Sequence, residues 1–245
     1  MLKKIAVEML ARLGYRISKI DPGNSLDIPF QAMKDMIGEK SDLIIFDVGA
    51  HHGLTAREFR AFFPASCIHC FEPFPESFEI LARTTSSDSF IINHNFGISN
   101  ENKKLAFHSN ESSATNSILS TDSRGSMTWG KGLLETKEIV QADFRSLDSF
   151  AQEYSIPHIN ILKLDVQGAE HLVLEGARSL CEQKMIDLIY MEIIIQPTYK
   201  RQRRLDEVLA YLNDIGFDLF NFYHPCFTPA GRLCQVDAIF TQSTS

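Results

Sequence analysis

The chain carries no excess of positive charge. Its 245 residues include 24 lysines and arginines against 31 aspartates and glutamates, which gives a net charge of −7 and a pI near 5.6. Nonspecific binding to nucleic acid draws most of its affinity from Lys and Arg side chains on phosphates. The composition therefore argues against a nucleic-acid partner, although it is compatible with a local basic groove.

Cysteine is scarce as well. Five scattered cysteines, an odd number, make no disulfide framework and are typical of reduced thiols in a cytoplasmic protein. Cys67 and Cys70 form a C-x-x-C motif, but a separation of three on an expected strand points the two side chains to opposite faces. No second pair accompanies them. Buried strand cysteines are therefore favoured over a zinc or redox centre, and no metal site is expected.

Long apolar runs and flexible linkers are also missing. No unbroken apolar stretch approaches the roughly 20 residues needed to cross a bilayer, so no transmembrane segment is expected. No Pro-, Ser- or Gly-rich linker divides the chain, and its 44% of hydrophobic residues can build one substantial core. We expect an N-terminal helical extension over residues 1–40 and one domain over residues 41–245.

The first residues begin like a signal peptide, but Glu8 and Arg12 interrupt what would be its apolar core. Apolar residues recur at helical spacing from Leu2 to Leu13, which predicts an amphipathic helix. Packing on the domain's edge is favoured. The alternatives are a substrate lid, a contact between copies of the chain in a homo-oligomer, and a helix on a membrane surface.

Two apolar runs with distinctive ends stand out. LIIFDVGAHHG, at residues 43–53, ends in an acid and a glycine-flanked turn, and CIHCFEP, at residues 67–73, ends in Glu72. Glycines let backbone amides approach a ligand closely, and a carboxylate that closes the next strand can accept both hydroxyl protons of a ribose. The pair of runs predicts an α/β fold that binds a nucleoside-bearing cofactor.

The glycine turn lacks the G-x-G-x-x-G spacing that a dinucleotide pyrophosphate needs. An acid and two imidazoles suit a zwitterionic amino-acid tail better, which favours S-adenosylmethionine. The cofactor contacts expected in and before the turn are Asp47, Gly49, Ala50, His51 and Gly53. A dinucleotide-dependent oxidoreductase and a non-catalytic S-adenosylmethionine-binding protein are the alternatives.

Strand and helix patterns alternate in the way that builds a mostly parallel sheet with helices on both faces. Seven main strands are expected at residues 43–48, 67–71, 90–93, 159–165, 186–194, 217–223 and 236–241, the last two as an antiparallel hairpin. Helices are expected at residues 53–63, 75–83, 146–154, 169–181 and 202–214. Residues 97–142, with strand-like pieces at 105–108 and 137–144, break the alternation and are expected to be an insertion over the active-site rim.

A further segment, LKLDVQGAEHLVLEGA at residues 162–177, completes a set of motifs with FDVGAHHG, FEP, YMEI at 190–193 and QVDAIF at 235–240. In this order and spacing the chain resembles the FkbM family of S-adenosylmethionine-dependent methyltransferases. The resemblance implies a Rossmann-like class I methyltransferase fold and O-methylation of a hydroxyl on a sugar, glycan or natural product. Gln167 departs from the family pattern, which has an acid at that place.

Methyl transfer to a hydroxyl requires alignment of the reacting atoms and a base for the hydroxyl proton. Asp165 ends a strand before a Gly-containing turn and is the first candidate for a catalytic and cofactor-binding carboxylate, against a helix-capping role. Glu192 lies in an apolar run and needs a partner, either structural or an acceptor hydroxyl. His51 is a further candidate, because a neutral imidazole suits general-base work near pH 7.

Other polar residues at the strand ends have weaker assignments. Asn95 follows the third expected strand and is a candidate contact for adenine, and Lys163 is expected to pair with a carboxylate. Asp237 repeats the pattern of Glu192 and either faces the same pocket or marks the wet side of its strand. The basic run at residues 200–204 would suit an anionic acceptor, with a solvated helix start as the alternative.

Overall fold

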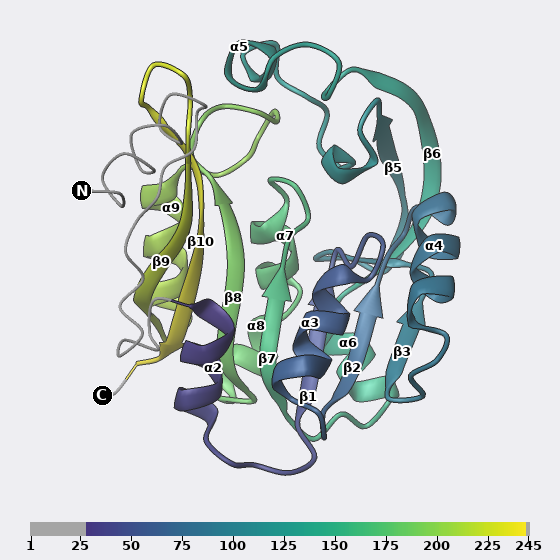
Figure 1. The fold of residues 1–245 in the computed structure, drawn as a ribbon, viewed down its shortest axis with the longest axis vertical. Coiled ribbons are helices and arrows are strands. Elements are labelled where there is room, and N and C mark those ends of the chain that lie inside the picture. The colour runs from purple at the N-terminus through teal and green to yellow at the C-terminus, as the bar shows by residue number, and fades with distance from the viewer. Residues whose placement is uncertain (1–27, 244–245) are drawn as a thin grey trace, which may run out of the picture.

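A computed structural model describes residues 28–243, which fold around one seven-stranded sheet (Figure 1). The strands lie in the order β3-β2-β1-β7-β8-β10-β9, and β10 runs antiparallel to both of its neighbours. Their bounds are β1 Ile44–Val48, β2 Cys67–Phe71, β3 Ile91–His94, β7 Ile159–Leu164, β8 Ile186–Ile194, β9 Phe217–Phe227 and β10 Leu233–Gln242. The predicted mostly parallel sheet with an antiparallel C-terminal hairpin is confirmed.

Helices cover both faces of the sheet, as the sequence predicts. One face carries α2 Pro29–Ile37, α3 Leu54–Phe62 and α4 Pro75–Thr85, and the other carries α6 Leu147–Glu153, α7 Glu170–Glu175, α8 Arg178–Glu182 and α9 Leu205–Asp214. The pleat of the strands divides the core between them, because successive side chains point to opposite faces. In β1, Ile45 packs toward α2 and α3, whereas Phe46 packs toward α6.

The predicted helix at residues 169–181 is wrong as a single element. The chain instead forms α7 and α8, separated at Gly176 and Ala177. A Cβ at Gly176 would lie 2.1 Å from the carbonyl oxygen of Ser99, so the chain passes that loop at a distance only glycine permits. This long-range approach coincides with the break between α7 and α8, and helical periodicity cannot reveal it.

Residues 97–142 form structure of their own beside the main sheet. β4 Gly97–Ile98, β6 Thr136–Arg145 and β5 Lys103–Asn110 make a second sheet in that order, so the two strand-like pieces at 105–108 and 137–144 are confirmed. The connection between β5 and β6 contains the 3₁₀ turn η2 Ser113–Thr115 and α5 Gly125–Trp129. It returns to the main sheet, where Ser117 Oγ donates to the carbonyl of Gln167 at 2.9 Å. Its role as a lid stays a prediction.

The predicted extension over residues 1–40 lies largely outside the described residues, which begin at residue 28 and include only α2 from it. The boundary at residue 40 and the amphipathic helix near the N-terminus therefore stay predictions. Among the residues that the structure describes, no helix combines the length and apolar character needed to cross a membrane.

We expect Phe150→Ala to lower the free energy of unfolding by about 3–5 kcal/mol, because it opens a cavity in the core. The Phe150 ring is fully buried, and its centroid lies 5.7 Å from that of Phe46 and 5.0 Å from that of Phe71. Urea denaturation measures the loss. The control is Tyr154→Ala, since Tyr154 is 49% exposed and its truncation should cost much less. Equal losses for the two variants would contradict this view of the core.

Candidate functional site

The turn after β1 has a backbone that only certain residues can adopt. Gly49 has φ 79°, and a Cβ there would lie 1.9 Å from the carbonyl oxygen of Asp165, so no larger residue fits. His51 follows with φ 49°, an uncommon conformation for a residue with a side chain. The amides of Gly49 and Ala50 both donate to the carbonyl of Phe71 at 3.1 Å. The turn is therefore held close to the ends of β2 and β7.

Glu72 closes β2 and is tied to the same turn. One carboxylate oxygen, Oε2, accepts from the amide of His51 at 2.9 Å, and the other, Oε1, accepts from the amide of Phe74 at 2.9 Å. Burial raises the pKa of Glu72 to about 7, although both amide hydrogen bonds lower it. The carboxyl group is thus poised to change its charge near neutral pH.

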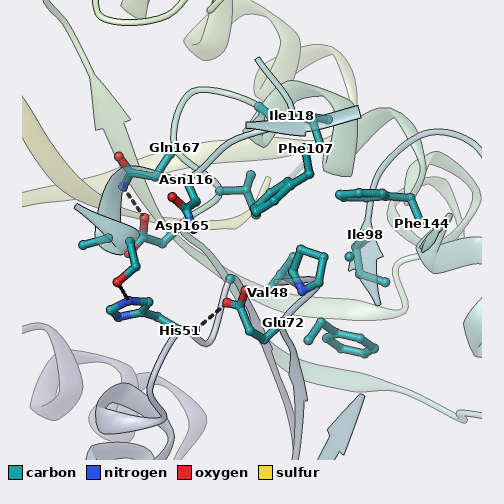
Figure 2. A pocket seen from close by; sticks show the side chains of 18 residues that line it. Val48, His51, Glu72, Ile98, Phe107, Asn116, Ile118, Phe144, Asp165 and Gln167 are labelled. Carbon is teal, nitrogen blue, oxygen red and sulfur yellow. Dashed lines mark hydrogen bonds between the residues drawn. The ribbon is translucent and has the colours of Figure 1, made fainter. Parts of the chain in front are cut away.

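A cavity of about 670 Å³ opens between this turn, Glu72 and the 97–142 segment (Figure 2). Its polar wall comes from Gly49, His51, Glu72, Asp165 and Gln167. Its apolar wall comes from Val48, Phe71, Ile98, Phe107, Ile118 and Phe144. A ligand with one flat apolar end and one polar end fits this division.

Asn116 is a cavity residue that the sequence analysis missed. Its side chain is 9% exposed and lines the cavity, and its Oδ1 accepts from the amide of Asn110 at 2.8 Å. Within residues 28–243, its Nδ2 has no hydrogen-bond partner. A buried donor without a partner costs free energy, so Nδ2 is available to a ligand. Nothing in the local sequence singles out Asn116 within a polar stretch.

Asp47, a predicted cofactor contact, is fully buried and does not line the cavity. Its Oδ1 lies 2.8 Å from Nζ of Lys163, which also donates to the carbonyl of Gly49 at 3.0 Å. The predicted pairing of Lys163 with a carboxylate is confirmed. Burial acts to lower the pKa of Lys163, but Asp47 and Asp165 outweigh burial and raise it. Asp47 therefore contributes to the site indirectly, by holding Lys163, which in turn holds the turn after β1.

Asp165 and Glu192, two predicted catalytic residues, are joined by an amide. Gln167 Nε2 donates to Asp165 Oδ1 at 2.8 Å and to Glu192 Oε2 at 2.9 Å. The Asp165 side chain is 38% exposed and lines the cavity, whereas Glu192 does not line it. Burial and the nearby Asp165 raise the pKa of Glu192 well above its usual value. Among the predicted acids, Asp165 is the one that reaches both Gln167 and the cavity.

His51, the third predicted catalytic residue, lines the cavity with its ring stacked 3.6 Å from that of His52. Its Nε2 lies 2.8 Å from Ser113 Oγ. Burial, with a smaller effect from His52, lowers the pKa of His51 to about 4, so the imidazole is neutral at physiological pH. Neutral His51 can hydrogen-bond a ligand without repelling a cationic one.

Three other predicted cofactor contacts lie outside the cavity lining. Ala50 is buried, Gly53 is the N-cap residue before α3, and Asn95 is exposed and donates to the backbone carbonyl of Glu72 at 3.1 Å. The Asn95 amide is instead used in that contact with the end of β2. The apolar wall of the cavity is formed in part by side chains of the 97–142 segment, such as Ile98 and Phe107. A direct contact from any of these three residues stays a prediction.

The basic run at residues 200–204 is partly neutralised. Arg203 pairs with Glu175 at 2.7 Å, and Arg204 pairs with Asp206 at 3.0 Å. Among the described residues, no group of three or more His, Cys, Asp or Glu side chains has a geometry suited to a metal ion. All five cysteines are free.

Comparison with known proteins agrees with these features. The Methyltransferase FkbM domain matches residues 47–219. The chain is 28% identical over 197 residues to 2-O-methyltransferase NoeI of Sinorhizobium fredii (strain NBRC 101917 / NGR234), covering 78% of this chain and 79% of that protein. It is 30% identical over 146 residues to Methyltransferase 1 of Beauveria bassiana (strain ARSEF 2860), covering 55% and 58%. An rRNA methylase structure from Streptococcus thermophilus shares the fold, with a TM-score of 0.50, 11% identity and coverage of 94% and 100%.

We expect Lys163→Met to lower the free energy of unfolding by about 3–5 kcal/mol, because it leaves the buried Asp47 carboxylate without its counter-charge. The double variant Asp47→Asn/Lys163→Met removes both charges and should recover much of that loss. Urea denaturation of the two variants measures the difference. If the double variant is as unstable as Lys163→Met, the unpaired charge is not the cause.

Proposed function

The chain belongs to the FkbM methyltransferase family, and from this premise we propose that it methylates a hydroxyl oxygen of a sugar, glycan or natural product. S-adenosylmethionine is the cofactor of such a methyltransferase. The relative named 2-O-methyltransferase supports oxygen as the methylated atom. The observation that carries the proposal is one cavity that brings Glu72, His51 and Asp165 together from three separate strand ends.

The cavity fits this cofactor at three points. The Glu72 carboxylate lies where the hydroxyls of a ribose can donate to it, and its rigid bonds to the amides of His51 and Phe74 fix its position. The apolar wall with Phe107 and Phe144 suits the adenine ring of the cofactor. The unpartnered Nδ2 of Asn116 supplies a hydrogen-bond donor for a ring nitrogen. The glycine turn and Asp165 form the polar end, which suits a charged amino-acid tail.

When bound, S-adenosylmethionine supplies an electrophilic methyl group, whose bond to sulfur breaks with its electron pair left on sulfur as the acceptor oxygen forms the new bond to carbon. The protein must align the acceptor and take up the hydroxyl proton. Asp165 is placed for this, since Gln167 holds its Oδ1 and leaves Oδ2, 3.8 Å from Lys163 Nζ, to receive the proton.

The other two candidate bases are less free. Glu192 accepts from Gln167 on one oxygen and from Gln235 on the other, at 2.9 Å each. The Nε2 of His51 already lies 2.8 Å from Ser113 Oγ. We therefore assign proton uptake to Asp165, the orientation of the cofactor's polar end to His51, and support of Asp165 to Glu192.

The experiment that tests the function is photo-crosslinking of the protein with tritiated S-adenosylmethionine, set beside fluorescence titration with NADH. We expect labelling that S-adenosylhomocysteine competes away, and no NADH binding. A protein that binds NADH and takes up no label would be an oxidoreductase instead. Transfer of tritium to a panel of hydroxyl acceptors then distinguishes an enzyme from a protein that only binds the cofactor.

We expect Glu72→Ala to weaken S-adenosylmethionine binding by about 1.5–3 kcal/mol at pH 8, because a charged acceptor is lost. The pKa of Glu72 is near 7 and the ribose prefers the ionised carboxylate, so wild-type affinity should rise as the pH increases through 7. Glu72→Gln keeps the shape without the ionisation and should show a flatter pH profile. Calorimetry measures both effects, and the same profile in wild type and Glu72→Gln would exclude Glu72 as their source.

We expect Asp165→Asn to lower turnover by about 10²-fold or more, because the amide cannot take up the hydroxyl proton. The amide keeps the size of the side chain, so the urea midpoint should change little, and affinity for S-adenosylhomocysteine should fall much less than turnover. Tritium transfer to an acceptor from the panel measures turnover. A variant that keeps wild-type turnover removes Asp165 from proton transfer.

A further inference from the structure

A second cavity, of about 780 Å³, also has Asp165 in its lining. Asp165 is the one described residue common to the linings of both cavities. The side chains that matter for its chemistry are Tyr190 and Glu192 of β8, Gln235 and Asp237 of β10, and His224 of β9. A molecule in the second cavity could therefore reach Asp165 while the proposed cofactor occupies the first.

The second cavity arises from a change in polarity along one face of the sheet. In the middle of β7, β8 and β10, the side chains of Ile161, Leu188 and Ile239 pack in the core with residues of α2 and α3. Side chains two and four residues away on the same strand point to the same face of the sheet. Toward the carboxyl ends of β7 and β8, and toward the amino end of antiparallel β10, the side chains on this face are polar. The registers Lys163↔Tyr190 and Glu192↔Asp237 set these side chains next to one another. These polar side chains line the second cavity instead of packing in the hydrophobic core, so they can contact a ligand.

Asp237 organises the outer part of the second cavity. Its Oδ2 accepts from the hydroxyl of Tyr190 at 2.8 Å and lies 2.8 Å from Nδ1 of His224. An ionised carboxylate only accepts hydrogen bonds, so Nδ1 of His224 donates in this contact and Nε2 is left for a ligand. His224 is exposed and has φ 45°, a conformation that costs free energy for a residue with a side chain. This residue lies at an irregularity in the pairing of β9 with β10, which holds the imidazole at the cavity edge.

The charges around the second cavity select among acceptors. Four carboxyl groups line it, those of Glu58, Asp165, Glu192 and Asp237, against the one ammonium group of Lys163. Lys163 is already paired with Asp47, so it offers little to a bound anion. A phosphate would meet like charges at short range, whereas hydroxyl and ammonium groups would find acceptors.

We propose that the second cavity is the acceptor site and takes a polyhydroxylated molecule of neutral or positive charge, with one hydroxyl against Asp165 and another group against Asp237 and His224. This inference rests on the methyltransferase function proposed above. It opposes the anionic acceptor that the basic run at residues 200–204 suggests, since Arg203 and Arg204 of that run have acidic partners of their own.

The test is saturation-transfer NMR on the full chain with S-adenosylhomocysteine, using glucose, glucosamine and glucose 6-phosphate as probes. We expect saturation of glucosamine and glucose and little of glucose 6-phosphate. Asp237→Asn should weaken glucosamine binding about tenfold, because a charged acceptor is lost. The control is Asp218→Asn, which removes the same charge from an exposed position on the same hairpin and should leave binding unchanged.

His224→Asn serves if Asp237→Asn does not fold, since asparagine tolerates a positive φ, and it should weaken glucosamine binding in the same direction. Glucose 6-phosphate binding as well as glucosamine would overturn the proposal. So would binding of none of the three sugars, or equal binding by wild type and both cavity variants. Calorimetry with S-adenosylhomocysteine is the separate check on the cofactor site. Its failure in wild type would sink the methyltransferase function, whereas failure of the sugars alone would sink only this assignment.

Discussion

The buried contact between Lys163 and Asp47 is the interaction on which the site depends. It joins adjacent strands β1 and β7 at their carboxyl ends, and the same ammonium group holds the carbonyl of Gly49. Placing both charges inside the protein is expensive, so the pair gives little net stability by itself. The pair instead fixes the position of the turn after β1. With the turn held there, Gly49 approaches Asp165, and His51 comes within reach of Glu72.

Burial then divides similar side chains between different tasks. Asp47 and Asp165 both contact Lys163, at 2.8 and 3.8 Å, but Asp47 is fully buried and Asp165 is 38% exposed. The Asp47 carboxylate serves the buried ion pair, whereas the Asp165 carboxylate lines both cavities. A carboxylate that must exchange a proton needs access to its partner, and a structural one needs exclusion of water. The same residue type therefore serves as a structural carboxylate in β1 and as the carboxylate to which we assign proton uptake just after β7.

The parts that sequence could predict are those with a local signal. Alternation of apolar runs located the seven strands, and Glu72, His51 and Asp165 were found because each follows a strand in a recognisable turn. Phe107, Asn116 and Phe144 were missed because a contact across about 50 residues, between Ser117 and Gln167, brings their segment to the site. Asn95 shows the converse limit. Its place after a strand was clear, but its hydrogen bond to the backbone carbonyl of Glu72 joins residues 23 positions apart and has no local signal.

Gln167 explains why the rim can hold so many acids. Were this residue also a carboxylate, three such groups would meet within hydrogen-bonding distance, and at least one would have to bind a proton. The amide instead donates to Asp165 and Glu192 at once. Its Oε1 lies 3.0 Å from the hydroxyl of Tyr199, which is 2.8 Å from the carbonyl of Thr115. One side chain therefore holds Asp165 and, through Tyr199, links it to the segment that lines the first cavity, so a movement of that segment would be felt at the carboxylate to which we assign proton uptake.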